Sequence, residues 1–326
     1  MTWAATLVAV ITAVVNAASN VLQRAANRSE PRDLALSPRL VLHLLRRPLW
    51  LAGFGAVIAS FLLQATALRL GTLAGVQPII ILELPLTLVG AAVALKANIG
   101  RREWLATGGA AAGVAAFLAA LDPSGGSKGH APAGSWLAAG ASTVLVIGAV
   151  TAAGAASKGG RRAALLGVAT GVCFGLTAAL MKGMTGRLDG GIAGVLVAWQ
   201  TYAMVAAGLV GMFLLQNALH AGPLVAGQPG ITLADPAVAV LWGVLVFHES
   251  IRGGAFALVA VAAAVAIGVS TVALTRSPLL ENRERVAEGP GDPSASGPRE
   301  RPRGQAAGPE PRRAVLASGS LARPDG

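Results

Sequence analysis

Apolar residues along this chain gather in nine blocks, and short polar segments separate the blocks. Each block is about 20 residues long, which is the length that a helix needs to cross the hydrocarbon core of a bilayer. The pattern therefore predicts an all-α fold, a polytopic helical membrane protein with about nine transmembrane helices. The predicted spans are 3–24, 49–69, 72–95, 104–121, 134–156, 163–184, 192–219, 222–247 and 253–275.

The segment 34–47 is also apolar, but it has only 14 residues and contains Arg39, His43, Arg46 and Arg47. It is too short and too basic to cross a bilayer, so we expect an amphipathic helix that lies at the membrane interface. A tenth span at this place is the alternative that the sequence leaves open.

Two stretches of the chain look like copies of one another. The first contains Phe61-Leu62-Leu63-Gln64, Gln77-Pro78, Glu83 and Pro85, and the second contains Phe213-Leu214-Leu215-Gln216, Gln228-Pro229, Asp235 and Pro236. The offset is 152 residues at the first marker and 151 at the second. The first predicted span also matches the sixth, at an offset of 158 residues. The matched pairs there are Ser19 with Thr177, Leu22 with Leu180 and Arg24 with Lys182.

The copies are five spans apart, and an odd interval turns the second copy upside down in the membrane. We therefore expect two inverted four-helix repeats joined by a linking helix. Many secondary transporters have inverted repeats, with the substrate site near the midplane where the repeats meet. The predicted parts are a first repeat at 1–121, a linking helix and its loops at 122–162, a second repeat at 163–275 and a disordered cytoplasmic tail, rich in Pro, Gly, Ser and Arg, at 276–326.

The basic residues predict the orientation of the chain. The loops after the first, third and fifth spans hold twelve Lys and Arg, whereas the alternate loops hold five. The side richer in Lys and Arg is cytoplasmic, so we expect the N-terminus outside and the C-terminus in the cytoplasm. The net charge of +11 thus reflects topology, and no nucleic-acid partner is expected. A composition rich in Ala, Gly and Arg and poor in Lys suggests a bacterial cytoplasmic membrane.

Each copy places an acid, Glu83 or Asp235, near the middle of a predicted span. A carboxylate at the centre of a membrane helix costs about 2.5–3.5 kcal/mol on insertion scales, which makes a functional site the first hypothesis. We expect Glu83 and Asp235 to bind a proton or a coupling ion. The alternative is that both acids are structural partners of Arg69, Lys182 or backbone groups.

Prolines interrupt the same two spans, and we expect them to kink the helices. They are Pro78, Pro85, Pro229 and Pro236. A proline leaves the carbonyl four residues earlier without its helical hydrogen bond. Pro85 would free the carbonyl of Ile81 and Pro236 that of Thr232, each within one turn of an acid. A freed carbonyl beside a carboxylate can hold a cation or help to relay a proton.

Amide side chains recur around the acids, and we expect them to line a substrate cavity. They are Asn20, Gln64, Gln77, Gln216 and Gln228. Gln77 and Gln228 each precede a proline, which disfavours the α region, so the start of each helix is expected to be partly unwound. The alternative for each amide is a hydrogen bond that only holds two helices together.

Gly167, Gly171 and Gly175 recur at every fourth position of the sixth span. Small residues at this spacing let two membrane helices approach closely, so this ridge predicts helix packing.

The chain lacks the motifs of two common enzyme classes. It has no P-loop and no HExxH motif. Its one cysteine, Cys173, can form neither an intrachain disulfide nor a cysteine metal cluster, and its four histidines show no metal-ligand spacing. His248 and Glu249 stand at a helix end and are expected at the interface. We therefore expect no enzyme activity and no cofactor, and the sequence does not decide whether a metal binds.

The stretch ALRLGTLAGVQPIIILELPLTLVGAAVALKANI and its echo ALHAGPLVAGQPGITLADPAVAVLWGVLVFHESI resemble the drug/metabolite transporter (EamA-like) superfamily. In that superfamily a helix with a mid-span proline ends in a glutamate before the last helix of each repeat. Glu249 matches this glutamate, and the first copy has Asn98 instead. Most members have ten spans, so nine spans are closer to the magnesium transporters of the NIPA type. The resemblance implies a solute carrier and no particular substrate.

These features favour a secondary transporter that moves a small solute by alternating access, with a proton or cation as the coupling ion. One alternative is a carrier of magnesium or another divalent cation, as in the NIPA type. A second alternative, of another class, is a membrane scaffold that transports nothing and recruits partners through its tail.

Overall fold

The computed structural model describes residues 2–28, 48–94 and 98–277. The predicted interfacial segment at 34–47 lies outside the described residues, as does the predicted tail from residue 278 onward. The helices are α1 (Trp3–Arg28), α3 (Pro48–Leu70), α4 (Leu73–Ile80), α5 (Glu83–Ala94), α6 (Arg101–Leu121), α7 (Ala133–Ala155), α8 (Gly159–Thr185), the short η2 (Leu188–Gly190), α9 (Gly191–Val197), α10 (Trp199–Ala221), α11 (Leu224–Leu245) and α12 (Ala255–Thr275). Two strands, β1 (Ser124–Gly125) and β2 (Glu249–Ser250), pair antiparallel.

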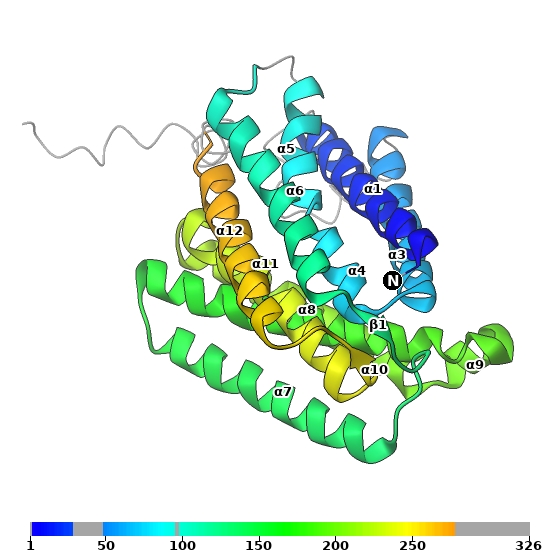
Figure 1. Ribbon diagram of the computed structural model, residues 1–326. Coiled ribbons are helices and arrows are strands. Elements are labelled where there is room, and N and C mark those ends of the chain that lie inside the picture. Colours follow the sequence, from blue (N-terminus) through cyan, green and yellow to red (C-terminus); the bar gives the residue numbers. More distant parts are fainter. Residues whose placement is uncertain (1, 29–47, 95–97, 278–326) are drawn as a thin grey trace, which may run out of the picture. The chain divides into compact units, whose positions relative to one another are not determined.

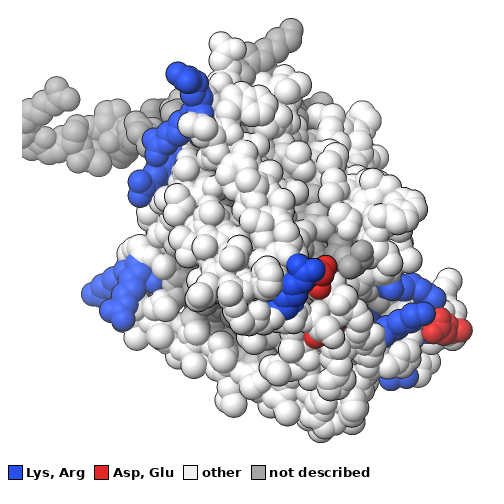
Figure 2. Space-filling view, viewed as in Figure 1, with Lys and Arg blue, Asp and Glu red and all other residues white. Residues whose placement is uncertain are grey.

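Within the described ranges, nine helical segments are long and apolar enough to cross a membrane. They fall on the nine spans predicted from the pattern of apolar residues, which confirms the all-α, membrane-spanning fold. Large apolar side chains point outward from these helices: Leu137 is 73% exposed, Leu145 is 72% exposed and Leu258 is 74% exposed. Figure 2 shows that most of the visible face is uncharged and that charged side chains gather in a few small groups. Lipid is the solvent that matches such a surface.

The structure corrects two of the predicted spans. The predicted span 72–95 is two helices, α4 and α5, separated by a two-residue turn. The predicted span 192–219 begins as the short helix α9, and Ala198, whose backbone is extended (φ −68°, ψ 122°), separates it from α10. That block has 28 residues, more than the roughly 20 that one crossing needs, and the surplus forms α9.

Each half of the chain packs around its first helix. α1 lies against α3, α4 and α5, and α8 lies against α7, α10 and α11. The last helices of the two predicted repeats, α6 and α12, lie side by side, as the teal and orange ribbons of Figure 1 show. The halves also meet where α4 touches α11 and where α3 touches α8.

The predicted glycine ridge is the surface of α8 that touches α11. A Cβ atom on Gly167 would lie 2.2 Å from the carbonyl oxygen of Gly227. A Cβ atom on Gly171 or Gly175 would lie 2.7 Å from an atom of α11. The two helices can approach this closely only because these side chains are absent.

A matching ridge of alanines runs along α1. At the offset of 158 residues, positions 163, 167, 171 and 175 of α8 correspond to the residues of this ridge. They are Ala5, Ala9, Ala13 and Ala17, and all four are buried. Thr12 and Thr170 are a further matched pair at this offset. Both are buried, and both donate a hydrogen bond to the carbonyl four residues earlier, at 2.8 Å and 2.7 Å. The offset therefore pairs residues that lie in the same structural environment.

Helices α1 and α8 run in opposite directions. In the first turn of α1, Ala5 packs against Gly71. Lys182, in the last turn of α8, donates a hydrogen bond to the carbonyl of the same Gly71, at 2.9 Å. The start of α1 and the end of α8 therefore lie at the same end of the helix bundle, as an inverted repeat requires.

Substitution of Gly167 by alanine is expected to lower the free energy of unfolding by about 1–3 kcal/mol, because the added methyl group overpacks the contact with α11. The matched control is Gly140→Ala on α7, where a Cβ atom would meet nothing within 4 Å. The measurement is thermal unfolding of the purified protein in detergent. Equal melting temperatures for the two variants would contradict the assigned helix contact.

Candidate functional site

Both predicted acids lie at mid-depth in the helix bundle and are half-buried. Glu83 is the first residue of α5, in the middle of the α4–α5 segment, and Asp235 lies ten residues before the end of α11. The two carboxyl groups are close enough to interact electrostatically. Acids that are 152 residues apart in the sequence thus belong to one site.

Three of the predicted amides lie in this site and bond to the acids or to one another. The Asn20 side chain on α1 donates a hydrogen bond to the Glu83 carboxylate, at 2.6 Å. The buried Gln77 of α4 donates to the Asp235 carboxylate at 3.0 Å, and Gln64 of α3 donates to the Gln77 oxygen at 3.1 Å. Because Gln77 and Asp235 belong to different predicted repeats, their bond joins the two halves at the centre.

Two of the predicted amides are placed differently. Gln216 is exposed on α10, and Gln228 is half-buried in α11 without a bond to the acids. The prediction that Gln77 and Gln228 stand at partly unwound helix starts is wrong. Both residues are helical, since α4 begins at Leu73 and α11 at Leu224. The preference that a proline imposes on the preceding residue is local, and the surrounding helix overrides it.

The chain around Glu83 differs from the prediction in one detail. α4 ends before Glu83, and the amide of Leu84 donates a hydrogen bond to the carbonyl of Ile81, at 3.2 Å. The carbonyl that Pro85 would leave free therefore has another partner. In the second copy α11 continues as one helix through Pro229 and Pro236. Glu83 thus follows a break between two helices, whereas Asp235 lies within one continuous helix.

Further polar side chains of α1, before and after Asn20, bond to α3 or to each other. Ser60 donates a hydrogen bond to the Asn16 side chain, and Ser19 donates to the carbonyl of Gly53 at 3.0 Å. Gln23 donates to the hydroxyl of Ser19, also at 3.0 Å. The polar side chains of α1, here named its polar stripe, therefore run from Asn16 to Gln23.

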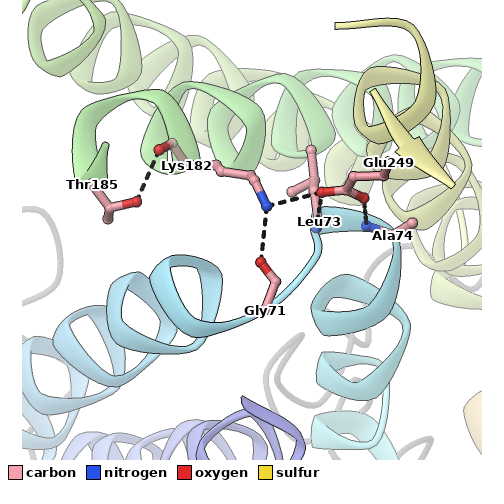
Figure 3. A network of polar contacts seen from close by, with 6 residues as sticks. All are labelled: Gly71, Leu73, Ala74, Lys182, Thr185 and Glu249. Carbon is pink, nitrogen blue, oxygen red and sulfur yellow. Dashed lines mark hydrogen bonds and ion pairs between the residues drawn. The ribbon is translucent and has the colours of Figure 1, made fainter. Parts of the chain in front are cut away.

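A second buried polar network, which the sequence did not predict, lies at one end of the bundle (Figure 3). Lys182 and Glu249 form an ion pair at 2.9 Å, with side chains 4% and 0% exposed. Glu249 also accepts hydrogen bonds from the backbone amides of Leu73 and Ala74, at 2.6 Å and 2.9 Å. These amides belong to the first turn of α4, whose partial positive charge favours a carboxylate.

This network corrects the prediction that Glu249 lies at the membrane interface. The residue is buried because strand β2 pairs with β1 and turns its side chain toward α4. Lys182 is likewise a buried partner of Glu249 and Gly71. Arg69 forms an exposed pair with Asp189 at 2.9 Å. The ion pairs of Arg69 and Lys182 are thus made with other acids than Glu83 and Asp235.

The chemistry available at the central site follows from these groups. Two carboxyl groups close to each other can take up a proton or a cation, and the amides of Asn20 and Gln77 donate hydrogen bonds to them. The described part of the chain holds no cluster of three His, Cys, Asp or Glu side chains arranged to hold a metal ion.

Substitution of Glu249 by alanine is expected to lower the free energy of unfolding by about 3–5 kcal/mol, because it leaves the Lys182 ammonium buried without its partner. The control is Asp122→Ala, which breaks the exposed pair of Asp122 with Arg252 and should cost at most about 1 kcal/mol. Thermal unfolding in detergent compares the two variants. Similar melting temperatures would show that the Glu249 pair is not a buried charge pair.

Comparison with known proteins gives a relative but no described function. The chain matches no model of a protein family and no solved structure. A protein of Corynebacterium glutamicum described as uncharacterized is 30% identical to it over 277 residues, which cover 84% of this chain and 95% of the relative. Similarity at this level over most of both chains shows common descent, and the chain therefore belongs to the same family as this Corynebacterium protein.

Proposed function

We propose that this integral membrane protein is a secondary transporter that moves a small solute by alternating access and couples this movement to a proton or a cation. The two halves would move against each other around the central site, where Glu83 and Asp235 take up the coupling ion. Asn20, Gln64 and Gln77 would contact the solute or hold the acids. The resemblance to the drug/metabolite transporter superfamily supports this function class.

The observation that carries the proposal is the meeting of two acids from corresponding places in the two copies. Each acid is costly in a membrane helix, and pairing the two does not remove this cost, because like charges repel. Acids at such places can take up and release a proton or a cation, and their corresponding positions would give the two halves one shared site for it.

The proposed orientation places the N-terminus outside, so the end of the bundle with Gly71, Lys182 and Glu249 faces outward. The opposite end, toward which the polar stripe of α1 runs, faces the cytoplasm. The proposed location is the cytoplasmic membrane of a bacterium. This orientation rests on the distribution of Lys and Arg among the loops.

The first test begins with a thermal-shift screen of metabolites, and any stabilising compound is then followed into proteoliposomes under an imposed pH gradient. We expect the double variant Glu83→Gln with Asp235→Asn to lose uptake by at least about 100-fold, in the range of a lost essential proton acceptor. Undiminished uptake by this variant would remove both acids from the mechanism. Magnesium flux that persists without a pH gradient would instead favour the divalent-cation carrier. Deletion of 276–326 should leave the flux of a transporter intact, whereas a scaffold should lose its phenotype.

The second test compares two glutamines that occur in the same chain. Gln77→Leu removes the bond to Asp235, and uptake is expected to fall by about tenfold or more, the effect of roughly 1.4 kcal/mol on the rate-limiting barrier. The matched control is Gln216→Leu, since Gln216 is exposed on α10. Equal uptake by the two variants would contradict the role given to Gln77.

A further inference from the structure

We propose that the buried network of Lys182, Glu249 and the first turn of α4, here named the latch, is a releasable closure of one end of the bundle. The proposal deepens the transport function proposed above and rests on it. It names the contact that must break for that end to open.

The latch joins the two halves of the chain at one end. Gly71, Leu73 and Ala74 belong to the first half, and their backbone groups bond to Lys182 and Glu249 of the second half (Figure 3). Apolar residues fill the space beside it. The ring of Phe247 lies 5.5 Å from the Lys182 ammonium, and Trp136 packs edge-on against Phe247 at 5.7 Å. The ion pair of the latch is therefore bordered by packed aromatic rings.

The chemistry of the latch suits a contact that forms and breaks. Removing two charges from water costs nearly as much as their attraction returns, so a buried ion pair contributes little net stability. Apolar residues of the same volume would often hold the end more firmly. When the end opens, water can solvate the Lys182 ammonium, the Glu249 carboxylate and the amides of α4. The open state is then close in free energy to the closed state.

The opposite end has no matching latch in the described residues. The inverted repeat would place it between the residue that corresponds to Glu249 and the start of α11. That residue is Asn98, which is exposed, and the start of α11 at Leu224 has no side-chain cap. At the opposite end the described residues hold a different buried contact between the halves, in which the Ser277 hydroxyl donates a hydrogen bond to the Glu103 carboxylate at 3.1 Å, so the two ends are closed by unlike contacts.

Polar side chains extend from the central site in both directions, and one row of them runs away from the latch. From Glu83 this row leads along α1 through Asn20 and Ser19 to Gln23, which is half-buried. Gln23 lies 18 residues along α1 from Ala5, about 27 Å at the rise of an α-helix. The latch therefore closes the bundle on its own side of the central site, and a row of polar side chains on α1 leads toward the opposite end.

The experiment measures how fast single cysteines react with a membrane-impermeant maleimide in lipid nanodiscs, where both ends are accessible. In a Cys173→Ala background, Thr72→Cys reports on the latch end, because Thr72 is 4% exposed and its hydroxyl has no partner to lose. Gln23→Cys reports on the opposite end. With Glu249→Gln added, we expect Cys at 72 to react about tenfold faster and Cys at 23 several-fold more slowly, as a shift between two states requires.

The matched control is Asp189→Asn, which weakens the exposed pair with Arg69 and should change neither rate. The double variant Lys182→Met with Glu249→Met replaces the ion pair by apolar side chains of similar volume, which should hold the end more firmly, so Cys at 72 is expected to react more slowly in it. The proposal is overturned if neither latch variant changes the rate at position 72, if both reporters speed up together, or if Asp189→Asn acts equally. The labelling reaction requires no solute. The rates can therefore be measured, and the latch tested, even if the transport tests fail.

Discussion

Inside a bilayer a polar group can be satisfied only by another group of the protein, since the surrounding hydrocarbon neither donates nor accepts hydrogen bonds. This constraint explains why the ionisable side chains of the interior come in sets. Glu83 and Asp235 share the centre with the amides of Asn20 and Gln77, and Glu249 has three donors around its carboxylate. Each set joins helices that are distant in the sequence. Because an unpaired polar group would be costly, these bonds help to determine how the two halves pack against each other.

Close helix packing makes these sets possible. The glycines of α8 bring the backbone of α11 so near that Asp235, one turn before Val238 at the contact with Gly175, is held close to the bundle centre. The alanines of α1 allow the corresponding approach in the first half, where α4 and α5 carry Gln77 and Glu83. Small residues thus have an indirect role at the central site, because they set the distance at which polar groups on neighbouring helices can bond.

Much of this arrangement could be predicted from the sequence, for physical reasons that differ between elements. The spans followed from their length, because a bilayer has a fixed thickness. The gathering of Gln77 with the two acids followed from the internal repeat, since two inverted copies place equivalent residues around one axis. The four-residue spacing of Gly167, Gly171 and Gly175 indicated a close contact between helices.

Other features could not be predicted, because they depend on three-dimensional contacts without a local pattern. Glu249 bonds to backbone amides of α4, and every residue except proline carries such an amide, so the sequence marks no partner. The polar surroundings of Gln64 differ from those of its counterpart Gln216, because α10 presents that position outward. Proline follows Glu83 by two residues and Asp235 by one, and only the first helix breaks. A repeat therefore identifies corresponding positions, but each copy has its own environment.

The Gln77 amide links the protonation of Asp235 in the second half to side chains of the first half. Its nitrogen faces the Asp235 carboxylate, and its oxygen faces the nitrogen of Gln64. A proton bound at the facing oxygen of Asp235 would turn that acceptor into a donor, and the amide of Gln77 would then have to rotate to offer its oxygen. Gln64 would in turn have to rotate, since it would meet a donor where it had an acceptor. The charge of one side chain in α11 is thereby converted into the orientation of two amides, the second of them on α3.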